Sequence, residues 1–177
     1  ALAGPSTLNR LELSNHKTTR CHKIAHLPAQ VEACVLEMGA RCLPKHAEEL
    51  VLDLDAMGPR LHGEQEGRFF HGYYDDYCYL PLYVFCGNIP LWAQLRTADR
   101  DAADGALEAV KKTVAELRRR NPGVRIILRA DSGFAREELM AWSESQTGVY
   151  YCFGLAQNSR LLELAAVAMA HWVRRRG

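Results

Sequence analysis

The chain has 177 residues, enough to form one ordinary domain with a sizeable core. Hydrophobic residues make up 48% of it and the formal net charge is +1, a balance that fits a soluble globular protein and neither requires nor rules out a nucleic-acid partner. No apolar run approaches the roughly 20 residues that a membrane-spanning helix needs, so the sequence excludes a membrane-spanning protein.

The first 47 residues predict an N-terminal region made of an arm and a helix. Residues 1–20 are polar and weakly patterned, which suits a short helix or an extended arm. Residues 28–43 predict a helix, because Pro28 suits a first helical turn and the following apolar residues recur on one side. Gly39 and Pro44 end it.

An apolar run over 49–56 carries two acidic residues near its end. Its leucines alternate with Val51, Asp53 and Asp55, so the run predicts a strand in which Asp53 and Asp55 share one face. Burying unpaired charge is costly, so a strand that brings carboxylates to its C-terminal end is interpreted as part of a site.

The later elements predict a mixed α/β sheet. After a polar loop over 61–68, a β-rich run over 69–85, in which Pro81 suggests a bulge or kink, leads through a turn to a returning strand over 89–96. A helix over 102–120, a strand over 124–128, a helix over 135–145, a strand over 149–153 and a helix over 159–173 follow. This order predicts three antiparallel strands and a helical crossover that returns the fourth strand parallel to the first.

Asp131 directly follows the predicted fourth strand. If that strand lies beside the first, Asp55 and Asp131 meet at the same edge of the sheet. Adjacent strands lie about 5 Å apart, so the two carboxylates would reach the same metal ions.

Several long blocks of the sequence match one known family. They are LAGPSTLNRLE at 2–12, LVLDLDA at 50–56, HGEQEGRFFHGYY at 62–74, CYLPLYVFCG at 78–87, LRADSGFA at 128–135 and FGLAQN at 153–158. Together they resemble bacterial DDE transposases of the insertion sequence 1380 family.

The resemblance implies a partial RNase H-like DDE catalytic domain over 48–177, truncated at its C-terminus, that cuts and joins DNA with two divalent ions, Mg²⁺ or Mn²⁺. It assigns catalytic and metal-binding roles to Asp55 and Asp131. Asp53 is an accessory residue or a rival for the first role. Arg129 is a candidate phosphate contact, and His62 either lines the DNA path or stabilises its loop.

The resemblance also implies partners and a compartment. The partners would be double-stranded DNA with terminal inverted repeats and, for the full-length protein, a second copy of the chain. The compartment would be the bacterial cytoplasm, at the nucleoid. The six cysteines agree with a reducing compartment: none falls in a C-x-x-C pair, and we expect buried free thiols.

The sequence departs from the family pattern in two places. Residues 57–60, Met-Gly-Pro-Arg, stand where family members usually have a hydroxyl residue and acidic residues. The family's catalytic Glu lies well beyond the second Asp, and no Glu of this chain sits there; Glu137, Glu138 and Glu163 are expected to be solvated helix residues. We therefore expect an incomplete fragment that is inactive alone.

Two other functions remain open at this stage. A strand ending in Asp53-Leu54-Asp55 also opens haloacid-dehalogenase-like phosphatases, in which the first Asp is the nucleophile and the second the acid and base. A non-enzymatic alternative is a remnant that folds and binds DNA or a full-length transposase without cutting.

Overall fold

The computed structural model describes residues 27–58, 61–63, 67–156 and 158–174. The expected arm at 1–20 lies outside these residues. The elements are, in chain order, α2 (Pro28–Cys42), β1 (Glu49–Ala56), β2 (Phe69–His71), β3 (Asp76–Cys78), β4 (Leu82–Cys86), β5 (Ile89–Gln94), α3 (Ala106–Arg120), β6 (Arg125–Ala130), the 3-10 turn η1 (Ser132–Phe134), α4 (Glu137–Ser145), β7 (Val149–Phe153) and α5 (Ser159–Arg174).

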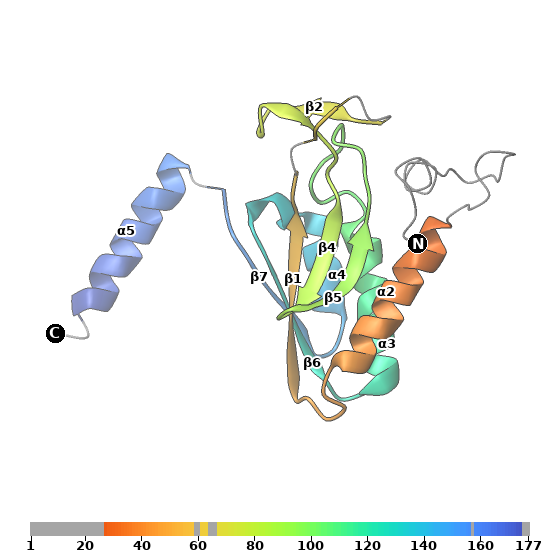
Figure 1. Cartoon of the computed structure of the whole chain (residues 1–177). Helices are drawn as coiled ribbons and strands as arrows, with labels where there is room; N and C mark the ends of the chain where they lie inside the picture. Colours follow the sequence, from red (N-terminus) through yellow and green to blue (C-terminus); the bar gives the residue numbers. More distant parts are fainter. Residues whose placement is uncertain (1–26, 59–60, 64–66, 157, 175–177) are drawn as a thin grey trace, which may run out of the picture.

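Five strands form one mixed sheet in the order β5-β4-β1-β6-β7 (Figure 1). β1 pairs antiparallel with β4, and β4 antiparallel with β5. β6 pairs parallel with both β1 and β7. The predicted antiparallel start and the parallel return through α3 are therefore confirmed. This strand arrangement is consistent with an RNase H-like core.

One face of the sheet packs against helices α2, α3 and α4. Leu50, Leu52 and Leu54 of β1 are buried in a core that also includes Val110 of α3 and Leu139 of α4. Helix α2 contributes to the same core. Because alternate side chains of a strand point to opposite faces, the intervening residues of β1 point away from these helices.

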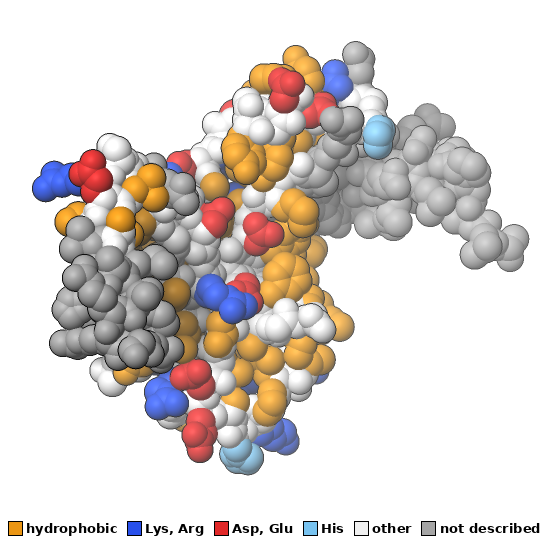
Figure 2. Space-filling model, turned by 90° about the vertical axis from the view of Figure 1, so that its left-hand side faces the viewer, with side chains coloured by type: hydrophobic (Ala, Val, Ile, Leu, Met, Phe, Trp, Pro, Cys, Tyr) orange, Lys and Arg blue, Asp and Glu red, His pale blue; other side chains and the backbone are white. Residues whose placement is uncertain are grey.

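We call the opposite side of the sheet the open face. It carries Asp53 and Asp55 of β1, Arg129 of β6 and Cys152 of β7. In Figure 2, acidic and basic side chains lie together near the centre of this side, with hydrophobic side chains around them. Helix α5 extends from the end of β7 away from the sheet (Figure 1). The candidate site residues therefore lie on the side opposite α2, α3 and α4.

The β-rich run over 69–85 is not the single strand that its composition predicted. It divides into β2, β3 and β4, and β2 and β3 form a separate two-stranded sheet. The chain turns through 72–75, where Asp75 has a φ of 49°, a left-handed conformation that Asp tolerates better than most residues. Aromatic β propensity runs through this turn, so propensity alone did not reveal it.

The five cysteines that the structure describes are free, but their burial differs from the expectation. Cys78 is buried, whereas Cys34, Cys42 and Cys152 are exposed. Burial of the thiols was therefore predicted wrongly for these three residues. Among the described residues, no helix has the length and apolar character needed to cross a membrane.

Candidate functional site

Strand register arranges the side chains of the open face in rows. One row runs from Phe85 through Asp53 and Arg129 to Cys152, across β4, β1, β6 and β7. In the next row Asp55 pairs with Tyr83. The pairing of β1 with β6 ends at Asp53 and Arg129, and Asp131 directly follows β6, two residues beyond Arg129. Because β1 and β6 are parallel, the two residues to which the sequence assigned catalytic and metal-binding roles lie at the same end of the sheet.

Asp131 is held in place by the turn that it begins. It is the N-cap of η1, and its Oδ1 accepts a hydrogen bond from the backbone N–H of Gly133 at 2.8 Å. Phe134, at the end of the turn, is buried in the core. The side chain is exposed, and its second carboxylate oxygen has no hydrogen-bond partner within the described residues. One oxygen therefore orients the carboxylate, and the other is free to coordinate a cation.

Gly154, just after β7, lets the chain pass close to this turn. Its N–H donates to the carbonyl of Ala130 at 3.0 Å. A Cβ on Gly154 would lie 3.1 Å from the backbone nitrogen of Ser132 and 3.5 Å from Cα of Asp131. The sequence analysis missed this role; a glycine directly after a predicted strand was the available signal.

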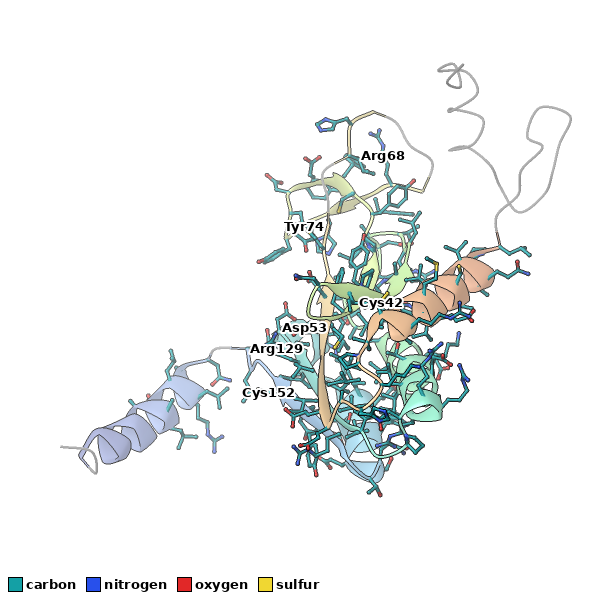
Figure 3. All side chains as sticks on the ribbon, turned by 60° about the horizontal axis from the view of Figure 1, so that its bottom comes forward. Cys42, Asp53, Arg68, Tyr74, Arg129 and Cys152 are labelled. Carbon is teal, nitrogen blue, oxygen red and sulfur yellow. The ribbon has the colours of Figure 1, made fainter. Side chains whose placement is uncertain are left out.

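Asp53 and Arg129 form a two-pronged ion pair across β1 and β6. Arg129 donates from Nε to Oδ1 of Asp53 at 2.5 Å and from Nη2 to Oδ2 at 2.9 Å. These hydrogen bonds, and the carboxylate charge, raise the pKa of Arg129, which stays protonated. Figure 3 shows the two side chains next to each other. Arg129 thus occupies both carboxylate oxygens of Asp53.

Asp55 differs from Asp53 in having no such partner. It is exposed, and no hydrogen bond or ion pair engages it within the part of the chain that the structure describes. Of the two acids on β1, Asp55 is therefore the one whose carboxylate is available. This matches the sequence-based preference for Asp55 over Asp53.

The end of β1 is fixed by Tyr74, which the sequence analysis did not single out as a positioning residue. Its hydroxyl donates to the carbonyl of Ala56 at 3.1 Å. Its ring packs on Gly58, where a Cβ would lie 2.5 Å from the ring carbon Cε2. Gly58, which the sequence analysis treated as part of a departure from the family pattern, thus has a structural reason of its own.

Within the described residues, no hydrogen bond or ion pair joins the other sequence candidates to the side chains of Asp55 or Asp131. His62 is exposed in a segment next to β3, where the N–H of Leu61 donates to the carbonyl of Tyr77 at 3.4 Å. The three glutamates expected to be solvated, Glu137, Glu138 and Glu163, are exposed.

The arginines at the end of α3 are bonded within the protein. Arg119 and Arg120 both pair with Glu116 of the same helix. Arg118 donates to the backbone carbonyl of Thr147. These three side chains therefore have partners within the protein.

The carboxylates of Asp55 and Asp131 are the type of ligand that hard divalent cations prefer. Mg²⁺ prefers oxygen ligands and keeps several of its waters, so two carboxylates with free oxygens suffice as protein ligands. No group of three or more His, Cys, Asp or Glu side chains with metal-binding geometry occurs within the described residues. The described residues thus offer a two-carboxylate site.

Comparison with known proteins points to one family. No curated protein sequence matches the chain. The solved structures include a piggyBac transposase synaptic complex with hairpin DNA, 14% identical, with a TM-score of 0.42, matched over 63% of this chain and 24% of that one. The chain thus spans about a quarter of that transposase chain.

A family model described as "Transposase DDE domain group 1" matches residues 1–176, which is nearly the whole chain. The blocks that resemble DDE transposases, including those around Asp55 and Asp131, all lie inside this match. The chain belongs to the transposase DDE domain group 1 family.

Proposed function

We propose that the chain is part of a DNA transposase of the insertion sequence 1380 type, with an RNase H-like core that cuts and joins DNA at the ends of a mobile element. The observation that carries the proposal is the position of Asp55 and Asp131 at the C-terminal ends of the neighbouring parallel strands β1 and β6, in a chain of the DDE transposase family. The division into an N-terminal helical and arm region over 1–47 and a partial catalytic domain over 48–177 remains a prediction.

Asp55 and Asp131 would hold Mg²⁺ or Mn²⁺. A divalent ion at this place would supply Lewis-acid activation of water or a 3′ hydroxyl and would stabilise the departing oxygen. The protein's own contribution is rigid placement of the carboxylates, because strand ends and a hydrogen-bonded turn hold them more firmly than a long loop would.

The partners that we propose are double-stranded DNA with terminal inverted repeats and a second copy of the full-length protein. Membership of the transposase DDE domain family supports a DNA partner. His62 beside the hairpin of β2 and β3 is a candidate contact for such DNA.

The test is metal-dependent nicking of duplex DNA that carries the repeats flanking the coding sequence. Both this chain and the longest reading frame that contains it should be assayed with Mg²⁺ and with Mn²⁺. We expect nicking by the longer form, reduced at least about 100-fold by Asp55→Asn or Asp131→Asn, because each change removes a charged metal ligand. Asp99→Asn, at an exposed acid outside the site, is the matched control and should leave the rate unchanged.

Two other outcomes would redirect the assignment. DNA binding without nicking by either form would favour a remnant that binds DNA or another transposase. Hydrolysis of small phosphate esters that depends on Asp53 would favour a phosphatase. The phosphatase has less support, because Arg129 engages both oxygens of Asp53 and a hairpin rather than a helix follows β1.

A further inference from the structure

The charges on the open face follow one cross-strand pattern along β1 and β6. Glu49 lies opposite Arg125 and pairs with it at 3.4 Å, and Asp53 lies opposite Arg129. The next acid on this face of β1, Asp55, lies beyond the last paired position, and the residue two positions after Arg129 is Asp131 rather than an arginine. The acids at the first two positions are therefore neutralised by arginines, whereas at the third position both chain segments carry an acid.

The Asp53–Arg129 pair lies close to these two carboxylates. Asp55 lies two residues from Asp53 along β1, about 7 Å at the usual strand rise. Asp131 follows Arg129 by two residues along the chain. At that separation a single uncompensated charge changes the binding of a divalent cation by roughly fivefold, even in a dielectric close to that of water. Whether Asp53 and Arg129 neutralise each other therefore matters to an ion held by Asp55 and Asp131.

We propose that Arg129 sets the cation affinity of the Asp55–Asp131 pair by neutralising Asp53 and keeping that carboxylate away from the ion. This inference rests on the proposed metal-binding role of Asp55 and Asp131. Arg129 and Asp53 act as positioning residues. Arg129 keeps the Asp53 carboxylate from coordinating the ion, and Asp53 neutralises the Arg129 charge that would otherwise repel the ion. The pair thus limits the site to two acids.

The two partners should have opposite effects on affinity when removed singly. Asp53→Asn leaves the Arg129 charge uncompensated and should weaken cation binding by about fivefold. Arg129→Gln frees the Asp53 carboxylate and should strengthen binding by about the same factor or more. The double variant, and Arg129→Lys, which keeps the charge, should stay close to the unchanged protein.

The measurement is Mn²⁺ binding to the whole chain at low ionic strength. Free Mn²⁺ is followed by electron paramagnetic resonance, and line broadening of backbone amides shows where the ion binds. The matched controls are Glu49→Gln and Arg125→Gln, which alter the same kind of pair about 20 Å from Asp55 along β1. They should change affinity by less than about twofold, because the Coulomb energy falls with distance.

The two possible failures can be told apart. If Asp55→Asn and Asp131→Asn leave Mn²⁺ binding unchanged, the metal site and the proposed function fail together. If they abolish binding but Asp53→Asn and Arg129→Gln shift affinity in the same direction or not at all, only the present inference fails. If the Asp53–Arg129 pair only stabilised the fold, both variants would bind Mn²⁺ more weakly. Both would also have lower thermal stability, which circular dichroism would detect.

Discussion

Single residues at the end of β1 determine where Asp55 is presented. Tyr74 holds the carbonyl of Ala56, and its ring occupies the space in which a side chain at position 58 would begin. A glycine next to a strand end is often interpreted only as a chain break. Here it permits the contact that fixes the strand end next to the candidate site.

Gly58→Ala should therefore destabilise the protein. The new Cβ would lie 2.5 Å from the Tyr74 ring and force it away, together with its hydrogen bond to Ala56. We expect a loss of about 1–3 kcal/mol in the free energy of unfolding, measured by urea denaturation. Gly72→Ala is the matched control, because a Cβ there meets nothing within 4 Å. Equal effects of the two changes would contradict this account of Gly58.

The candidate site acids follow from local signals in the sequence, whereas the partner of Asp53 does not. The alternation along β1 and the family resemblance single out Asp55 and Asp131, and the roles assigned to these two residues remain predictions. The pairing of Arg129 with Asp53 joins residues 76 positions apart and depends on strand register. No local pattern encodes that register, so Arg129 was interpreted only as a phosphate contact.

At the scale of elements, helix α3 shows how tertiary contacts move a boundary. Its apolar spacing predicted a start at residue 102, but the helix begins at Ala106. Arg96, buried just after β5, donates to the carbonyls of Leu80, Ala102 and Asp104. Gly105 then adopts a φ of 78°. These contacts hold 102–105 as a loop, which amphipathic periodicity alone cannot indicate.

The C-terminal end of α3 is stabilised by a charge cluster around Glu116. Hydrogen bonds from Arg119, and then from Arg120, lower the pKa of Glu116 from 4.5 to about 2. A lowered pKa means that folding is favoured by the ionised carboxylate. The stabilisation is therefore present above pH 4.5 and is lost as the pH falls toward 2.

Glu116→Gln should lower the free energy of unfolding by about 1 kcal/mol at pH 7, because the two ion pairs are partly exposed and screened. The difference from the unchanged protein should shrink between pH 4.5 and 2, as the carboxylate is protonated in both states. Urea denaturation at several pH values measures this. Glu108→Gln, which breaks a single exposed pair with Lys111 in the same helix, should have a smaller effect. A pH-independent difference would argue against the ion pairs as the cause.

At the scale of the whole molecule, the alternation of strands and helices made the sheet predictable. Long elements with a clear period, such as β1 and α3, fix most of the chain order, and right-handed crossovers then limit the topology. The hairpin of β2 and β3 was missed, because its strands have three residues each and aromatic composition hides the turn between them. Short elements carry too little periodicity to be recognised.

This architecture predicts unequal local stability, which amide hydrogen exchange would measure. Leu52 and Leu128 lie on the central strands β1 and β6, are fully buried, and should exchange only through global unfolding. Phe70 and Tyr77 pair within the two-stranded hairpin and are about half exposed, so their amides should exchange through local opening that depends little on denaturant. If the hairpin amides showed the same free energy of exchange and denaturant dependence as Leu52, the hairpin would unfold together with the sheet. That outcome would mean that contacts between the hairpin and the sheet, such as the hydrogen bond from Tyr74 to Ala56, couple the two in unfolding.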